Sequence, residues 1–232
     1  MVHQSAFISD LQAAWETWYL TEFDFRAACL EQMAQQVRST HPSVAGMFDY
    51  HCRQAKLHAG GCDELVGATG ETNELYTTGR GISVIVQKSS DGQAQLSVFA
   101  MVATALVTGN TVMLCTDDQS TIDLVNQMCS SENLPANIIK ISACDTYNAM
   151  LDEDIRVLGI VGSNEAVTRL NQQLAQRSGA LVQYVFESDV DNIPCAKDPY
   201  LSLRFVTERT RTINITAIGG NASLLELGSD GH

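Results

Sequence analysis

From residue 80 onwards, short apolar runs alternate with segments of helix length. The runs are GISVIV from residue 81, TVMLC from 111, NIIKIS from 137, RVLGIVG from 156 and LVQYVF from 181. They lack the regular polar alternation of half-solvated strands, so they are expected to be buried on both faces. Helical segments between them, such as EAVTRLNQQLAQR from 165, predict a parallel sheet with right-handed crossovers. The expected fold class is α/β, a Rossmann-like doubly wound parallel sheet.

The first sixty or so residues have a helical period instead. SDLQAAWETWYL places Leu11 and Trp18 on one face, and DFRAACLEQMAQQV does the same with Phe25 and Met33. A third helix is expected to begin at Pro42 and to stop at Gly60. We therefore predict an N-terminal helical segment over residues 1–66, in which the tryptophans serve packing.

From residue 200 the period falls to two. LSLRFVTERTRTINITA alternates apolar and polar positions, with a break at TER, which predicts a two-stranded antiparallel β-flap. The domain prediction is thus a Rossmann-like unit over residues 67–199 and a hairpin flap with its tail over 200–232. The glycine-rich run GCDELVGATGETN is the expected linker. An isolated hairpin is marginal in water, so the flap needs a partner surface.

Charge and composition exclude several classes of function. The net charge is −13, from 27 acidic and 14 basic residues, and the basic residues are scattered, so nucleic-acid binding is not expected. No apolar run has the length of a membrane span, and the start does not resemble a signal peptide. The expected location is cytoplasmic. Seven cysteines without a C-x-x-C pair indicate structural thiols, and no metal site is predicted.

Candidate catalytic and nucleotide sites are sparse. The turn VQKSSDGQAQ lacks the glycine spacing of a dinucleotide fingerprint. Gly162 and Ser163 precede a helix that begins near Glu165, and this turn is either an anion site or a plain helix cap. Cys195 is the candidate nucleophile, but no histidine lies between His58 and His232 to activate it. Acidic pairs such as residues 117–118 are expected to be solvated surface.

Two stretches resemble one family. GATGETN at 67–73 and ERTRTINITAIGGNASLLELG at 208–228 are similar to motifs in the C-terminal region of proline utilization A, close to P-G-P-T-G-E-x-N and N-T-x-A-G-G-N-A-S-L. Ala68 and Ile218 depart from these motifs. The resemblance covers about residues 24–228, and the terminal motif is the more specific of the two. Gly162, Ser163 and Glu165 also match a G-S-T-E turn of aldehyde dehydrogenases, with Asn164 departing.

The resemblance implies an architecture and a role. The family joins an FAD-dependent proline dehydrogenase to an NAD-dependent glutamate semialdehyde (pyrroline-5-carboxylate) dehydrogenase, and longer members add a C-terminal aldehyde dehydrogenase-like domain. That domain is implied to keep the Rossmann-like half and the flap without the catalytic half. This chain has QKSSDG and TDDQS where aldehyde dehydrogenases have Pro-Trp-Asn and Lys-Pro turns, so no cofactor is expected here, and Gly162, Ser163 and Glu165 are vestigial candidates.

The predicted function is a non-catalytic domain that covers the dehydrogenase active site and supports channelling of the intermediate. Its partner is the dehydrogenase domain of the same polypeptide or of a second protomer, and peripheral membrane association of the parent is left open. The predicted docking residues are Ile213, Asn214, Ile215, Thr216, Ile218, Gly219, Gly220, Asn221, Leu224 and Leu225. Two alternatives stay open: an NAD-binding aldehyde dehydrogenase-like enzyme fragment, and an oligomerisation module that forms a homodimer through the flap.

Overall fold

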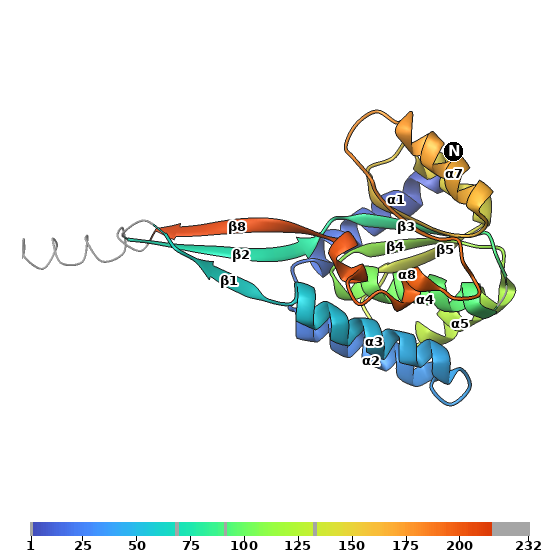
Figure 1. Ribbon diagram of the computed structural model, residues 1–232, viewed down its shortest axis with the longest axis horizontal. Helices are drawn as coiled ribbons and strands as arrows, with labels where there is room; N and C mark the ends of the chain where they lie inside the picture. Colours follow the sequence, from blue (N-terminus) through green and yellow to red (C-terminus); the bar gives the residue numbers. More distant parts are fainter. Residues whose placement is uncertain (1, 68–69, 91, 132–133, 215–232) are drawn as a thin grey trace, which may run out of the picture. The chain divides into compact units, whose positions relative to one another are not determined.

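A computed structural model describes residues 2–67, 70–90, 92–131 and 134–214 of the chain (Figure 1). The described residues divide into two compact units, a larger one formed by residues up to 60 together with 78–207, and a smaller one formed by residues 61–77 together with 208–214. The helices are α1 (Val2–Trp18), α2 (Phe23–Val37), α3 (Pro42–Ala59), α4 (Gly92–Val107), α5 (Gln119–Met128), α6 (Tyr147–Met150), α7 (Asn164–Ala175) and α8 (Pro194–Lys197). The strands are β1 (Cys62–Leu65), β2 (Glu71–Gly79), β3 (Ile82–Gln87), β4 (Thr111–Cys115), β5 (Ile139–Ser142), β6 (Ile155–Val161), β7 (Gln183–Glu187) and β8 (Val206–Asn214).

The larger unit is built on a five-stranded sheet in the order β5-β4-β3-β6-β7. All four strand pairs are parallel, and Ile82 to Val86 of β3 face Thr111 to Cys115 of β4 in continuous register. Strands β3 and β4 are buried at every position, because helices cover both faces of the sheet. The predicted doubly wound α/β fold is confirmed.

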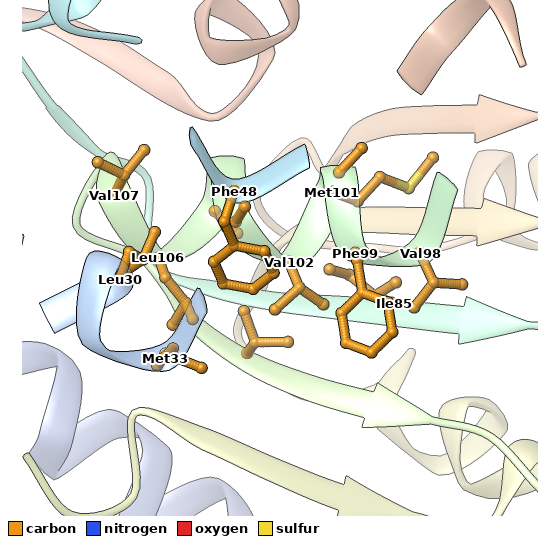
Figure 2. Packing of buried hydrophobic residues seen from close by; sticks show 14 of the residues in the cluster. Leu30, Met33, Phe48, Ile85, Val98, Phe99, Met101, Val102, Leu106 and Val107 are labelled. Atoms are coloured by element: carbon orange, nitrogen blue, oxygen red, sulfur yellow. The ribbon is translucent and has the colours of Figure 1, made fainter. Parts of the chain in front are cut away.

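A layer of helices covers one face of this sheet: α4 contacts β3, β4 and β6, and α2 and α3 pack against α4, with α5 beside α2. Helix α4 lies in the middle of this layer, and its apolar side chains are buried from Val98 to Val107 (Figure 2). Phe48 of α3 and Phe99 of α4 lie 6.2 Å apart between ring centroids, and Leu30 of α2 belongs to the same cluster. The N-terminal helices predicted over residues 1–66 are therefore part of the core of the larger unit.

The opposite face packs on α1 and α7. Leu11 of α1 and Val167 and Leu170 of α7 form a second cluster with Val84 and Met113 of the sheet. Because neighbouring residues in a strand point to opposite faces, Ile85 belongs to the first cluster and Val84 to the second. Within the described residues, no helix combines the length and the apolar character that crossing a membrane requires.

A buried amide fixes the end of α4. Gly109, with φ of +87°, ends the helix, and Asn110 follows it. The Asn110 side chain accepts a hydrogen bond from Gly81 N at 3.0 Å and donates to the carbonyl oxygens of Ala105 and Phe205 at 3.1 and 2.9 Å. This side chain therefore joins the start of β3, the end of α4 and the turn before β8.

The smaller unit is a three-stranded sheet in the order β1-β2-β8 (Figure 1). Strand β1 pairs antiparallel with β2, and Cys62 faces Tyr76. Two sequence predictions were wrong here. The stretch predicted as a linker contains β1 and the start of β2, and the stretch predicted as the first flap strand is a 3-10 turn, Leu201–Arg204. The single strand β8 supplies the C-terminal part of the flap.

Candidate functional site

The carboxyl edge of the parallel sheet is where this fold offers a binding site. Strands β4 and β5 lie on one side of β3, and β6 and β7 lie on the other side. The strand order therefore reverses between β3 and β6. Loops diverge at such a point and leave a crevice, which is the usual ligand position in doubly wound folds. A cavity of about 410 Å³ lies at this edge, lined by Lys88, Asp145, Tyr147, Asn148, Ile160, Ser163, Glu165, Ala166, Arg169 and Leu170.

Lys88, the first residue after β3, is already paired. Its Nζ lies 2.8 Å from Oδ1 of Asp145 and 5.0 Å from the ring centroid of Tyr147. Burial lowers the pKa of Lys88, but its hydrogen bonds to Asp145 and Cys144 outweigh burial and raise the pKa above its ordinary value. The ammonium group is therefore held in its charged form by the chain itself.

The turn after β6 brings together the predicted candidates Gly162, Ser163 and Glu165. Ser163 caps α7, since its Oγ accepts a hydrogen bond from Ala166 N at 3.3 Å. A Cβ on Gly162 would lie 2.9 Å from Cβ of Lys88, so glycine is needed here because the Lys88 side chain passes close to it. The serine is explained by capping of α7 and the glycine by packing against Lys88, which favours the helix-cap interpretation of this turn.

The neighbouring turn after β4 is filled by hydrogen bonds among side chains. Gln87 accepts from Thr116 Oγ1 at 2.9 Å and donates to Asp118 Oδ2 at 3.0 Å. Asp118 also caps α5 by accepting from Ser120 N at 3.0 Å, and Asp117 accepts from Cys144 N at 2.9 Å. Asp117 is exposed and Asp118 is partly exposed, in line with the predicted solvated surface, and both carboxylates also fasten turns at the sheet edge.

A dinucleotide does not fit this set of residues. Asp145 and Glu165 both line the cavity, and their carboxylates would repel a pyrophosphate. Lys88 is already paired with Asp145. The Lys88 side chain also fills the space beside the Gly162 backbone, where a ligand would otherwise approach. At the N-terminus of α7, where free amides could receive a phosphate, Ser163 already accepts a hydrogen bond from Ala166 N.

Cys195 is poorly suited to act as a nucleophile. It lies in α8, and burial, followed by the nearby Glu187 carboxylate, raises the pKa of its thiol to about 12. A thiol with that pKa is almost entirely protonated near neutral pH, whereas the thiolate is the reactive form. Cys115 is a buried residue of β4. In the part of the chain that the structure describes, no three His, Cys, Asp or Glu side chains form a metal-ligand group.

A second cavity, of about 450 Å³, lies between α2 and α3. Arg38 on its wall pairs with Asp49 at 2.8 Å and with Glu31 at 3.2 Å. These ion pairs link the end of α2 to α3, so the charges of this cavity serve helix packing.

The flap contains the start of the predicted docking segment. Ile213 is 40% exposed, and the adjacent Asn214 is exposed as well. The other predicted docking residues, Ile215, Thr216, Ile218, Gly219, Gly220, Asn221, Leu224 and Leu225, lie outside the described residues.

Cross-strand pairs fix the register of β8 on β2. Arg211 pairs with Glu74 and lies 5.8 Å from the Tyr76 ring centroid, and Thr212 Oγ1 lies 2.6 Å from Asn73 Oδ1. Sequence reasoning missed β2 as the partner of β8. The β-forming residues of NELYTTG were the available signal.

Comparison with known proteins identifies the relatives of this arrangement. No protein-family model matches the chain. The bifunctional protein PutA of Rhizobium meliloti is 31% identical over 170 residues, which cover 71% of this chain. The chain is a relative of proline utilization A. It spans only 12% of that protein's length, so the activities of the longer protein are not transferred to it directly.

Solved structures give the same fold. A variant of Bradyrhizobium japonicum proline utilization A has a TM-score of 0.69 at 22% identity, over 81% of this chain and 22% of that one. The NADP-dependent glyceraldehyde-3-phosphate dehydrogenase of Bacillus halodurans, solved with NADP, has a TM-score of 0.66 at 15% identity, over 81% of this chain and 44% of that one. The chain thus has the aldehyde dehydrogenase-like fold over a fraction of each neighbour's length.

Proposed function

We propose that this chain is a non-catalytic, aldehyde dehydrogenase-like domain of a proline-catabolic bifunctional enzyme. The parent would convert proline to glutamate through pyrroline-5-carboxylate or glutamate semialdehyde, with FAD and NAD bound in its other domains. The domain would lie against the dehydrogenase domain, cover its active site and help to enclose the route of the intermediate. Its partner would belong to the same polypeptide or to a second protomer in the cytoplasm.

The exposure of the three-stranded flap carries this proposal. Strand β1 is exposed at all four positions, and β8 is exposed from Glu208 to Asn214. Among the described residues, β2 is only partly buried from Thr72 to Thr77 and is buried at Thr78 and Gly79, so the sheet gains little from hydrophobic burial. Three strands normally need an apolar face or a covering helix to be stable. A sheet of this kind gains that burial when a partner surface covers it.

Strand addition is the interaction that suits β8. It is an edge strand of its sheet and is nine residues long, while the opposite edge strand, β1, has four residues with Asp63 and Glu64 in its centre. Short, charged edges resist further pairing, whereas a long edge offers a continuous row of backbone groups. Main-chain hydrogen bonds along Thr210 to Asn214, extended by the following residues, would bind the domain to its partner.

The chemistry of the larger unit supports a role without catalysis. The cavity at the carboxyl edge is bordered by the Lys88–Asp145 ion pair and by Glu165, and the Cys195 thiol is buried with a raised pKa. These residues give neither a pyrophosphate cradle nor an activated nucleophile.

A truncation in the parent polypeptide tests the proposal. Ending the chain after Thr210 removes the distal part of β8 and the tail while leaving the larger unit in place. We expect the truncated enzyme to release more free intermediate during coupled conversion of proline to glutamate, measured with an intermediate-trapping reagent. An unchanged transient of free intermediate would contradict the proposal.

The alternative roles predict different outcomes for the chain alone. An NAD-binding fragment would give heat of binding in calorimetry with millimolar NAD. A self-associating module would sediment as a stable dimer without other domains, because its flap would pair with a second copy. The proposed role predicts neither result.

A further inference from the structure

The segment that follows β7, residues 188–200, is thinly packed. It runs from the end of β7 through α8 to the 3-10 turn that begins at Leu201, and within it only Ile193 and Ala196 are buried. Helix α8 contacts α4 and β7, and Figure 1 shows it beside α4. Segments with few buried apolar side chains open at a lower free energy than the core does. We call residues 188–200 the α8 segment.

Ile193 holds the backbone of the α8 segment in a strained conformation. Its φ of +46° and ψ of 54° lie in the left-handed region, and its side chain is 2% exposed. A β-branched residue is disfavoured there, because its side chain crowds the backbone. The conformation is held by hydrogen bonds from Ile193 N to the Asp189 carbonyl at 2.8 Å and from Lys197 N to the Ile193 carbonyl at 3.1 Å. Opening of the segment releases this strain, which lowers the free energy of opening.

A buried carboxylate holds the α8 segment from the β7 side. Glu187 is 2% exposed, and its Oε2 accepts hydrogen bonds from Cys195 N and Ala196 N at 2.8 and 3.4 Å. Its Oε1 accepts from Asp189 N at 3.2 Å. Among the described residues, no Lys, Arg or His nitrogen lies within 4.0 Å of this carboxylate. Because a buried charge without a counter-charge regains water when the segment opens, Glu187 also lowers the free energy of opening.

A buried histidine holds the same helix from the α3 side. His51 is 1% exposed, and its Nε2 lies 2.9 Å from the carbonyl oxygen of Ala196. Burial lowers the pKa of His51 to about 4, and the Ala196 carbonyl and Asp198 only partly oppose this. Opening of the α8 segment removes the cover from the ring, which then takes up a proton below pH 6.5. Acid therefore favours the open form.

The charged groups around His51 leave this sign unchanged. Asp198 is the charged side chain that raises the pKa of His51, and its effect is smaller than that of burial. Helix α4, which packs against both α3 and α8, has no charged residue. The other charged side chains on β7, α8 and the 3-10 turn are Glu187, Lys197 and Arg204.

We propose that the α8 segment is an acid-sensitive unit of local opening, which opens while the five-stranded sheet stays folded. The strain at Ile193 and the buried charge of Glu187 lower the free energy of opening, and the contact with His51 makes it depend on pH. The segment leads through the 3-10 turn into β8, so its opening loosens the chain at the entry to β8. This behaviour does not depend on the proposed docking role.

Hydrogen exchange at low urea concentrations tests whether the opening is local. The amides of Cys195 and Ala196 report on the α8 segment, and those of Val84 and Leu114 report on the sheet. We expect protection about tenfold or more lower at the two α8-segment amides, with almost no dependence on urea, because a small opening exposes little surface. If all four amides share one protection factor and one urea slope, the segment opens only with the whole unit and the proposal is overturned.

The pH dependence tests the role of His51. Between pH 7 and pH 5, the protection of the Cys195 and Ala196 amides, corrected for the intrinsic exchange rate, should fall about twentyfold, because His51 titrates at 6.5 in the open form and at about 4 in the closed form. His51→Gln should remove this fall. His41→Gln is the matched control and should keep it, because His41 is exposed at the N-terminus of α3.

Two results would contradict the acid sensitivity. One is a full twentyfold fall in His51→Gln, which would show that another group senses the pH. The other is a fall of less than about threefold in the wild type, which decides the matter even if His51→Gln does not fold.

Discussion

His51 provides a sharp test of how α3 is fastened to the segment around α8. Its ring is 1% exposed, and its Nε2 lies 2.9 Å from the carbonyl oxygen of Ala196. Because a carbonyl oxygen can only accept, Nε2 carries the proton of the neutral ring. Burial lowers the pKa of His51 from 6.5 to about 4, and the Ala196 carbonyl and Asp198 only partly oppose this. The ring is therefore neutral in the folded protein at pH 7.

The sign of the pH dependence follows from this lowered pKa. The unfolded chain takes up a proton at His51 as the pH falls below 6.5, while the folded chain resists it until the pH approaches 4. The stabilisation associated with the neutral ring is thus complete above pH 6.5 and is lost as the pH falls towards 4. With about 1.4 kcal/mol for each pH unit, the loss is about 2 kcal/mol at pH 5 and about 3 kcal/mol at pH 4.

The variant His51→Gln isolates this contribution, because a glutamine amide can donate to Ala196 and does not titrate. Urea unfolding at pH 7, 6 and 5 gives the free energy of unfolding for both proteins. We expect the difference between wild type and variant to change by about 2 kcal/mol between pH 7 and pH 5, with the wild type losing more. Parallel curves for the two proteins would refute the assignment of His51 as a buried neutral ring.

Three further predictions concern single residues. Asn110→Ala leaves the Gly81 amide without its partner and removes one of the two donors to the Phe205 carbonyl, and it should lower the free energy of unfolding by about 2 to 4 kcal/mol, measured by urea titration; a loss below about 1 kcal/mol would contradict the role of this amide. Glu187 is 2% exposed and accepts from Cys195 N at 2.8 Å, so Glu187→Ala should cost about 2 to 3 kcal/mol in the same assay, and an unchanged midpoint would count against it. The exposed Cys62 should react with a thiol reagent well before Cys195, whose thiol is buried with a pKa of about 12, and equal labelling rates by mass spectrometry would show that Cys195 is accessible.

The sequence predicted the five-stranded sheet because its signals are local. Buried parallel strands are continuous apolar runs, and α4 is an apolar helix that ends at a glycine with positive φ. The error between residues 201 and 205 also has a local cause. Leu201, Ser202 and Phe205 are buried and Leu203 is exposed, a helical spacing that resembles strand alternation when only the apolar letters are counted.

The candidate site could be predicted only in part, because it depends on contacts between residues that are far apart in the sequence. Gly162, Ser163 and Glu165 lie together at one turn because they are near neighbours in the sequence. Lys88 and Asp145 are 57 positions apart in sequence, and their ion pair at 2.8 Å depends on the order of the strands in the sheet. The pairing of β2 with β8 likewise joins residues 73 and 212. Long-range pairs of this kind decide what the cavity and the flap can bind.

The central claim is that this chain acts by docking on the dehydrogenase domain of a proline-catabolic enzyme. Adding the purified 232-residue chain to a parent polypeptide that lacks it tests that claim most directly. The free intermediate released during coupled conversion of proline to glutamate is measured with a trapping reagent as the chain is titrated in. Docking predicts that the trapped fraction falls with a saturable dependence on the chain. A trapped fraction that stays constant up to saturating concentrations of the chain would contradict it.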